Sequence, residues 1–112
     1  MSARPKPNYT PQEYLELEQA SEFKSEYLSG QIFAMAGGSP EHSAIASNIG
    51  GEVGNLLKRS PCQVFNSSLR VTIMATGLAA YPDVTVVCGE QHRHPLDRNS
   101  IINPTVLFEG DT

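Results

Sequence analysis

The sequence has no tryptophan, only two cysteines and no long run of apolar residues. Two cysteines cannot build the disulfide framework of a small secreted domain, and both lie among apolar neighbours, so we expect Cys62 and Cys88 to be reduced, buried thiols. No stretch reaches the ~18 apolar residues that a membrane span needs. The first eight residues carry two cations without an apolar run behind them, which predicts no signal peptide and a cytoplasmic protein without a membrane partner.

Positive charge is also scarce. The chain holds 8 Lys and Arg against 12 Asp and Glu, a formal net charge of −4. This balance excludes a broad basic surface as the main means of binding nucleic acid and leaves only a local contact. The candidates for such a contact are scattered and are expected on the surface: Lys58, Arg59, Arg70, Arg93 and Arg98.

The 112 residues are enough for one domain with a modest core. Residues 1–8, with two prolines, predict an extended lead-in, and residues 9–112 predict one folded unit. Thr10-Pro11-Gln12-Glu13 predicts a capped helix start, and Ser29-Gly30 predicts the turn of a hairpin between strands over 24–28 and 31–35. Ser39-Pro40 opens a second helix to about Lys58, in which three glycines predict close packing against another element.

The last third of the chain is strand-like. Residues 63–65 and 69–74 are expected to pair with each other, and residues 84–88 form an apolar run typical of a strand covered on both faces. The stretch 89–103, with His92, His94 and Asp97, predicts an irregular solvated loop, and 105–108 a final strand. This order predicts an α/β fold of the mixed α+β kind.

One pair of carboxylates carries the chemistry that the residues suggest. If the six-residue stretches Asp83–Cys88 and Pro104–Glu109 pair antiparallel, Asp83 lies opposite Glu109. Directly opposed residues share a face with Cβ atoms ~4.5–5.5 Å apart, and two carboxylates so close repel each other unless a cation or a proton intervenes. Mg²⁺ commonly takes one or two protein carboxylates together with water and phosphate. The alternative, a turn aspartate and a solvated glutamate, remains open.

Five ordered motifs resemble the Uma-two family of restriction-type endonucleases, within the PD-(D/E)XK nuclease superfamily of bacteria. They are the segments 9–15, 35–42, 68–71, 81–84 and 103–104, and the similarity extends from Tyr9 to Glu109. The resemblance implies a restriction-endonuclease-like core, with a mixed central sheet flanked by helices, and a nuclease that uses Mg²⁺ or Mn²⁺ to cut DNA. It also implies that Asp83 and Glu109 are catalytic residues and the metal ligands.

Other positions are assigned by the same resemblance. Glu26 matches an acidic residue on an early element that can assist the metal, and His42 matches a histidine after the Gly-Gly-Ser turn with no assigned role. Gln31 stands where relatives commonly carry an acidic residue. In the family, a segment after Glu109 leads to a helix with the catalytic lysine, and in this sequence no lysine follows Lys58. We therefore expect the N-terminal part of a nuclease domain, incomplete at its C-terminus.

Two classes of function follow from these observations. The first is a Mg²⁺-dependent DNA endonuclease, which binds DNA weakly and locally with a steep dependence on salt. The second is a non-catalytic remnant or interaction module that keeps the fold, and that forms a homodimer through the exposed last strand or binds DNA weakly.

Overall fold

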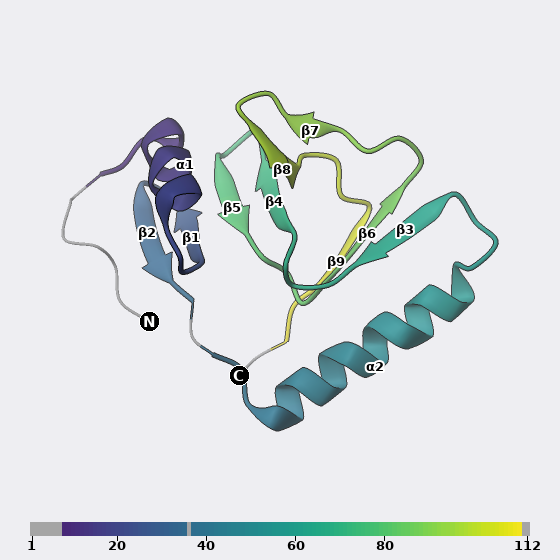
Figure 1. Cartoon of the computed structure of the whole chain (residues 1–112). Helices are drawn as coiled ribbons and strands as arrows, with labels where there is room; N and C mark the ends of the chain where they lie inside the picture. Colours follow the sequence, from purple (N-terminus) through teal and green to yellow (C-terminus); the bar gives the residue numbers. More distant parts are fainter. Residues whose placement is uncertain (1–7, 36, 111–112) are drawn as a thin grey trace.

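The computed structural model describes residues 8–35 and 37–110, so the predicted lead-in over residues 1–8 lies outside the described residues except for Asn8. Figure 1 shows how the helices and strands of the described residues are arranged. Their bounds, in chain order, are α1 (Pro11–Ala20), β1 (Ser25–Leu28), β2 (Gln31–Ala34), α2 (Pro40–Leu56), β3 (Cys62–Phe65), β4 (Arg70–Ile73), β5 (Leu78–Ala80), β6 (Val84–Cys88), β7 (Arg93–His94), β8 (Asp97–Ile101) and β9 (Val106–Phe108).

The first third of the chain folds as its local signals predict. The Thr10 hydroxyl accepts from the Glu13 amide while the Glu13 carboxylate accepts from the Thr10 amide, which completes the capping box of α1. The β1–β2 turn places Ser29 and Gly30 at φ angles of 49° and 82°. Two left-handed residues in succession define the turn that matches the twist of a hairpin. Ser39 caps α2 in turn, accepting from the His42 amide.

The strands form two sheets. The larger has six strands in the order β2-β1-β5-β4-β8-β7, and its β4–β8 pair is parallel while the others are antiparallel. The smaller has three antiparallel strands in the order β3-β6-β9. The predicted pairing of residues 63–65 with 69–74 is therefore wrong, because β3 joins β6 in one sheet and β4 joins β5 and β8 in the other. The fold is mixed α+β.

The stretch from residue 89 to 103 is not the irregular loop that its polarity predicted. It contains β7 and β8, and His94 and Asp97 are buried there. Arg70, expected as a surface cation, is also buried, and its Nε donates to Asp97 Oδ2 at 2.7 Å. Sequence polarity misled here because two opposite charges from β4 and β8 neutralise each other inside the protein, so neither needs water.

Helix α2 lies along β3 and β6, with no fully buried residue among those it contains. Ile45 is 60% exposed and Leu56 is 83% exposed, so the small sheet covers the apolar side chains of α2 only in part. The prediction of close packing at its three glycines is not met within the described residues: a Cβ on Gly50 would meet Val84 at an ordinary 3.9 Å, and Gly51 and Gly54 have no neighbour within 4 Å.

Two glycines therefore predict opposite responses to alanine. Gly51→Ala is expected to stabilise the chain by about 0.8–1 kcal/mol, because the methyl group enters open space on a helix that glycine weakens. Gly77→Ala is expected to destabilise it, because Gly77 has a φ of +76° and a Cβ there would lie 2.9 Å from Pro11 Cγ. Urea unfolding followed by circular dichroism measures both. Equal changes in the free energy of unfolding for the two variants would contradict the open space at Gly51 and the crowded, left-handed position of Gly77.

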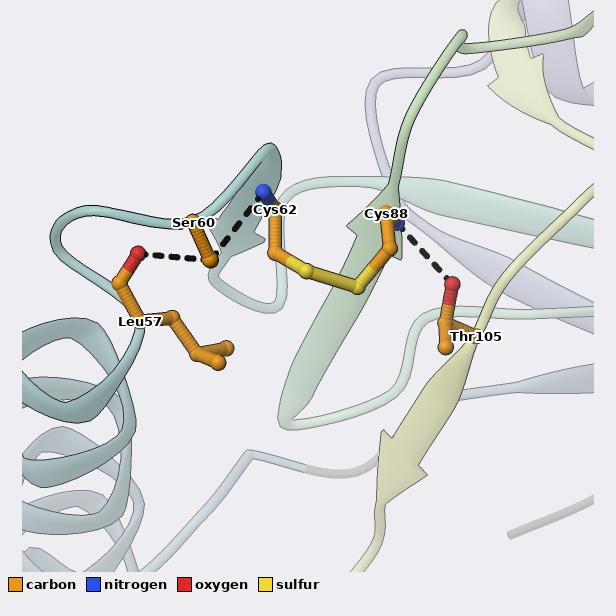
Figure 2. The surroundings of a disulfide bond; sticks show 5 residues. All are labelled: Leu57, Ser60, Cys62, Cys88 and Thr105. Carbon is orange, nitrogen blue, oxygen red and sulfur yellow. Dashed lines mark hydrogen bonds between the residues drawn. A yellow bond between two sulfur atoms is a disulfide. The ribbon is translucent and has the colours of Figure 1, made fainter.

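The two cysteines are joined, which corrects the expectation of reduced, buried thiols. Cys62 on β3 lies directly opposite Cys88 on β6, and their sulfurs form a disulfide (Figure 2). Cys88 is exposed and Cys62 is half-buried. The prediction failed because the two residues, 26 positions apart, become neighbours only through the β3–β6 pairing that the sequence did not reveal.

The apolar core of the larger sheet lies between α1 and the β1–β2 hairpin. It contains Tyr14, Leu15, Tyr27, Ile32 and Ala79. Within the described residues, no helix is long and apolar enough to cross a membrane. Strand β9 lies at the edge of the small sheet with Val106 and Leu107 exposed, so dimerisation through this strand stays a prediction.

Candidate functional site

The predicted carboxylate pair is brought together by the small sheet. Strands β6 and β9 pair antiparallel with Val84 opposite Phe108, and the same register one step further sets Asp83 opposite Glu109. The amide of Gly110, next to Glu109, donates to Asp83 Oδ2 at 2.7 Å. The register inferred from the equal strand lengths is thus confirmed, while the metal-binding role of the pair stays a prediction.

Asp83 is held in place from two sides. One oxygen accepts from the Gly110 amide, and the other, Oδ1, lies 3.0 Å from Nε2 of His42 on α2. Burial disfavours the charged form of Asp83, but the hydrogen bonds from Gly110 and His42 outweigh it and lower its pKa below the ordinary value. Asp83 is therefore ionised at neutral pH and fixed in orientation, as a ligand or a base needs to be.

Glu109 has the opposite electrostatic environment. Partial desolvation raises its pKa above the ordinary value, and the nearby charges of Glu26 and Asp83 raise it further. Glu26 comes from β1 in the larger sheet, where its Oε2 accepts from the Tyr81 amide at 3.3 Å. Three carboxylates from distant parts of the chain thus lie close enough to affect one another electrostatically. Their mutual repulsion favours a bound proton or cation.

These side chains line one cleft of about 790 Å³ between the sheets and α2. Its walls include Glu26, His42, Asp83 and Glu109. Two glycines leave room for the imidazole: a Cβ would lie 3.3 Å from His42 Cδ2 at Gly38 and 2.9 Å from His42 Cε1 at Gly110. Gly38 belongs to the Gly-Gly-Ser-Pro turn before α2, which is recognisable in the sequence.

The remaining site residue of the sequence analysis, Gln31, lies elsewhere. It begins β2 at the turn of the hairpin, opposite Leu28, and does not line the cleft. Among the described residues, no three His, Cys, Asp or Glu side chains come together as a ready-made metal cluster. A cation here would be held by the Asp83–Glu109 pair, with water or substrate completing its shell.

A buried polar network lies next to this cleft, and the sequence analysis did not predict it. The Tyr81 hydroxyl donates to Glu18 Oε2 at 2.5 Å and accepts from Arg70 Nη1 at 2.7 Å, and Arg70 pairs with Asp97. Burial, followed by the hydrogen bond to Glu18, raises the pKa of Tyr81 to about 12, so the hydroxyl keeps its proton. Because only Pro82 separates Tyr81 from Asp83, the network fixes the chain where β6 begins.

Replacing His42 tests how Asp83 is held. In His42→Ala the pKa of Asp83 is expected to rise, because the hydrogen bond from Gly110 is left alone against the larger, opposing effect of burial. A lowered carboxyl pKa stabilises the folded state above the unfolded-state pKa, and that stability is lost as pH falls through the folded-state pKa. The variant should therefore lose less stability than the parent on acidification. Carboxyl ¹³C NMR titration measures the shift, and an unchanged Asp83 pKa would contradict the contact.

The mixed α+β fold is of the restriction-endonuclease-like class, and in it Asp83, before the central strand β6, lies opposite Glu109, after the edge strand β9. Residues 11–109 match the model of the Uma2 family, described as "Putative restriction endonuclease", and the chain belongs to this family. In fold it is similar to the crystal structure of "a putative nuclease belonging to DUF820 from Anabaena variabilis ATCC 29413". The TM-score is 0.67 and the identity 26%, over 84% of this chain and 52% of that one.

Two curated relatives come from Synechocystis sp. (strain ATCC 27184 / PCC 6803 / Kazusa), and both are named as uncharacterized proteins. The chain is 39% identical to slr1290 over 108 residues, which cover 94% of this chain and 54% of the relative. It is 28% identical to sll1609 over 100 residues, covering 89% and 56% respectively. The chain thus spans about half the length of the curated relatives it matches.

Proposed function

We propose that this protein is a nuclease that hydrolyses phosphodiester bonds of DNA with Mg²⁺ or Mn²⁺ held by Asp83 and Glu109. The observation that carries the proposal is the position of these two carboxylates, opposite each other across β6 and β9 in one cleft. Membership of a family described as "Putative restriction endonuclease" supports the reaction class, and so does the similar fold of a protein described as "a putative nuclease".

The donor set fits a hard divalent cation. Both side chains offer oxygen, and Mg²⁺ commonly accepts one or two protein carboxylates and leaves its other positions to water and phosphate. Burial and, after it, the charges of Glu26 and Asp83 raise the pKa of Glu109, and a cation would neutralise the negative charge of these carboxylates. When bound, such a cation would offset charge on the phosphate and activate a water molecule for attack.

The other cleft residues take supporting parts in this proposal. His42 orients Asp83 through the 3.0 Å contact, and Gly110 holds the second carboxylate oxygen. Glu26 adds negative charge that favours the cation. Of the described residues that line this cleft, none is a lysine, so the catalytic lysine that the family resemblance implies has no counterpart among them. We also propose that the whole protein is an active nuclease, binds DNA and acts in the cytoplasm.

Two measurements on Asp83→Asn and Glu109→Gln test the proposal. Calorimetric titration with Mn²⁺ should show binding to the parent chain and at least a tenfold loss in either variant, because each removes a charged oxygen ligand. Glu52→Gln is the matched control, since it removes the same charge from an exposed position on α2. Equal Mn²⁺ binding by Asp83→Asn and Glu52→Gln would refute the metal site.

A plasmid-nicking assay then separates the enzyme from the non-catalytic remnant. The enzyme predicts nicking that needs added metal and disappears in Glu109→Gln. Metal binding without nicking at any metal concentration would favour a remnant that keeps the fold. Gel filtration of the same samples reports whether the chain is a dimer.

A further inference from the structure

A second cleft, of about 520 Å³, lies beside the carboxylate cleft. Its walls come from the segment between α1 and β1, the β3–β4 connection and the β7–β8 ribbon, which are distant in sequence. Four of the chain's eight Lys and Arg residues line it: Lys24, Arg70, Arg93 and Arg98. Half of the positive charge of an acidic chain is therefore gathered in one place.

Three of these cations are available to a ligand. Arg70 is buried and paired with Asp97, whereas Lys24, Arg93 and Arg98 are exposed. Arg93 Nη1 donates to the Arg98 carbonyl oxygen at 2.6 Å, a contact that links the two strands of the ribbon. The only exposed acidic residue among the described residues that line the cleft is Glu22, so the cleft carries a local positive charge.

The basic cleft and the carboxylate cleft adjoin each other and share part of their walls. Phe65, Asn66 and Tyr81 line both of them. At their junction Lys24 Nζ donates to the Ser67 carbonyl oxygen at 3.1 Å and lies 5.2 Å from the centre of the Tyr81 ring. A strand bound in the carboxylate cleft would therefore lie next to Lys24 and the basic cleft.

An aromatic side chain stands at the basic cleft with nothing covering it. Phe23, the residue before Lys24, is 77% exposed and lines the cleft. Exposed aromatic rings beside cations are the means by which proteins bind single nucleic-acid strands: the cations follow the phosphates and the rings stack on the bases. Leaving a phenylalanine in water has a cost that stacking on a base would remove.

We propose that the basic cleft binds a single strand of DNA next to the phosphate that is cut, with Lys24, Arg93 and Arg98 on its phosphates and Phe23 stacked on a base. The choice of DNA as ligand rests on the proposed function. The choice of a single strand rests on the confinement of charge: a net charge of −4 repels a duplex lying across the surface, whereas one strand needs only the basic cleft.

The experiment measures binding of a fluorescein-labelled oligothymidylate by anisotropy in EDTA, so that neither metal nor cleavage contributes. Arg93→Gln/Arg98→Gln should weaken binding at least tenfold and reduce the slope of log K against log salt by about 1.4, since two phosphate contacts are lost. Lys58→Gln/Arg59→Gln is the matched control, because it removes the same charge from exposed residues outside the cleft. Phe23→Ala should weaken binding by about tenfold without changing the slope.

Further controls separate a loss of strand binding from a loss of folding, and the binding site from the nuclease activity. Arg98→Gln alone keeps the Arg93 side chain, and thermal melting of each variant shows that the β7–β8 ribbon is intact. Equal affinities of Arg93→Gln/Arg98→Gln and Lys58→Gln/Arg59→Gln would overturn the inference, as would tighter binding of a duplex of the same length. Strand binding at the basic cleft by a protein that never nicks a plasmid would refute the nuclease and leave this binding site standing.

Discussion

Replacing Asp97 by asparagine is expected to cost about 3–5 kcal/mol of folding free energy, because it leaves the buried Arg70 guanidinium without a counter-charge. Burial disfavours the charge on Arg70, and hydrogen bonds to Asp97 and Tyr81 outweigh that effect and raise its pKa. A guanidinium keeps its proton even without a partner, so Arg70 stays charged in the variant. Urea unfolding monitored by circular dichroism measures the loss, which is a large fraction of the stability of a domain of this size.

The controls separate the charge from its surroundings. Arg98→Gln, one position further along β8 and exposed, should change stability by no more than about 0.5 kcal/mol. The double variant Arg70→Met/Asp97→Leu should recover most of the loss, because an apolar pair of similar volume often replaces a buried ion pair without cost. A loss below about 1 kcal/mol in Asp97→Asn would mean that water reaches Arg70 in solution.

The second large effect is expected from the disulfide. Reduction, or the double variant Cys62→Ser/Cys88→Ser, should lower the free energy of unfolding by about 3.5 kcal/mol, the chain-entropy value for cysteines 26 positions apart. The cross-link joins β3 to Cys88, at the end of β6 that lies away from Asp83 (Figure 2). Its loss removes a covalent restraint on β6, the strand that positions the carboxylate pair. Thermal melting with and without dithiothreitol measures the effect.

The double serine variant also provides the control for the reductant. Dithiothreitol should lower the melting temperature of the parent chain and leave that of Cys62→Ser/Cys88→Ser unchanged. If the parent is equally insensitive, the thiols are free in solution and the bond contributes nothing to stability.

The parts of the fold that the sequence predicted are those set by local chemistry. The capping box at Thr10, the left-handed turn at Ser29-Gly30 and the Ser39 cap each depend on residues within four positions of one another. The β6–β9 register was also predictable, because two apolar stretches of equal length with an acid at one end have one pairing that aligns both ends. That alignment found the Asp83–Glu109 pair.

The parts that failed depend on contacts between distant residues. Arg70 and Asp97 look like surface charges until the parallel β4–β8 pair buries them together, and Cys62 meets Cys88 only because β3 joins β6 rather than β4. The contact of His42 with Asp83 had no local signal either, although the glycine turn before α2 marked a place where room was needed. Resemblance to relatives identified His42, and only the structure showed what it touches.

The candidate site draws on four separated segments of the chain, at Glu26, His42, Asp83 and Glu109. Asp83 also takes its second hydrogen bond from the amide of Gly110, beyond all of these. During synthesis, a ribosome-bound chain that has not yet emerged to this residue holds the acidic groups without the geometry that aligns them. A site assembled from such dispersed segments is complete only when residues 26 to 110 are folded together, so nascent or proteolysed fragments lack it.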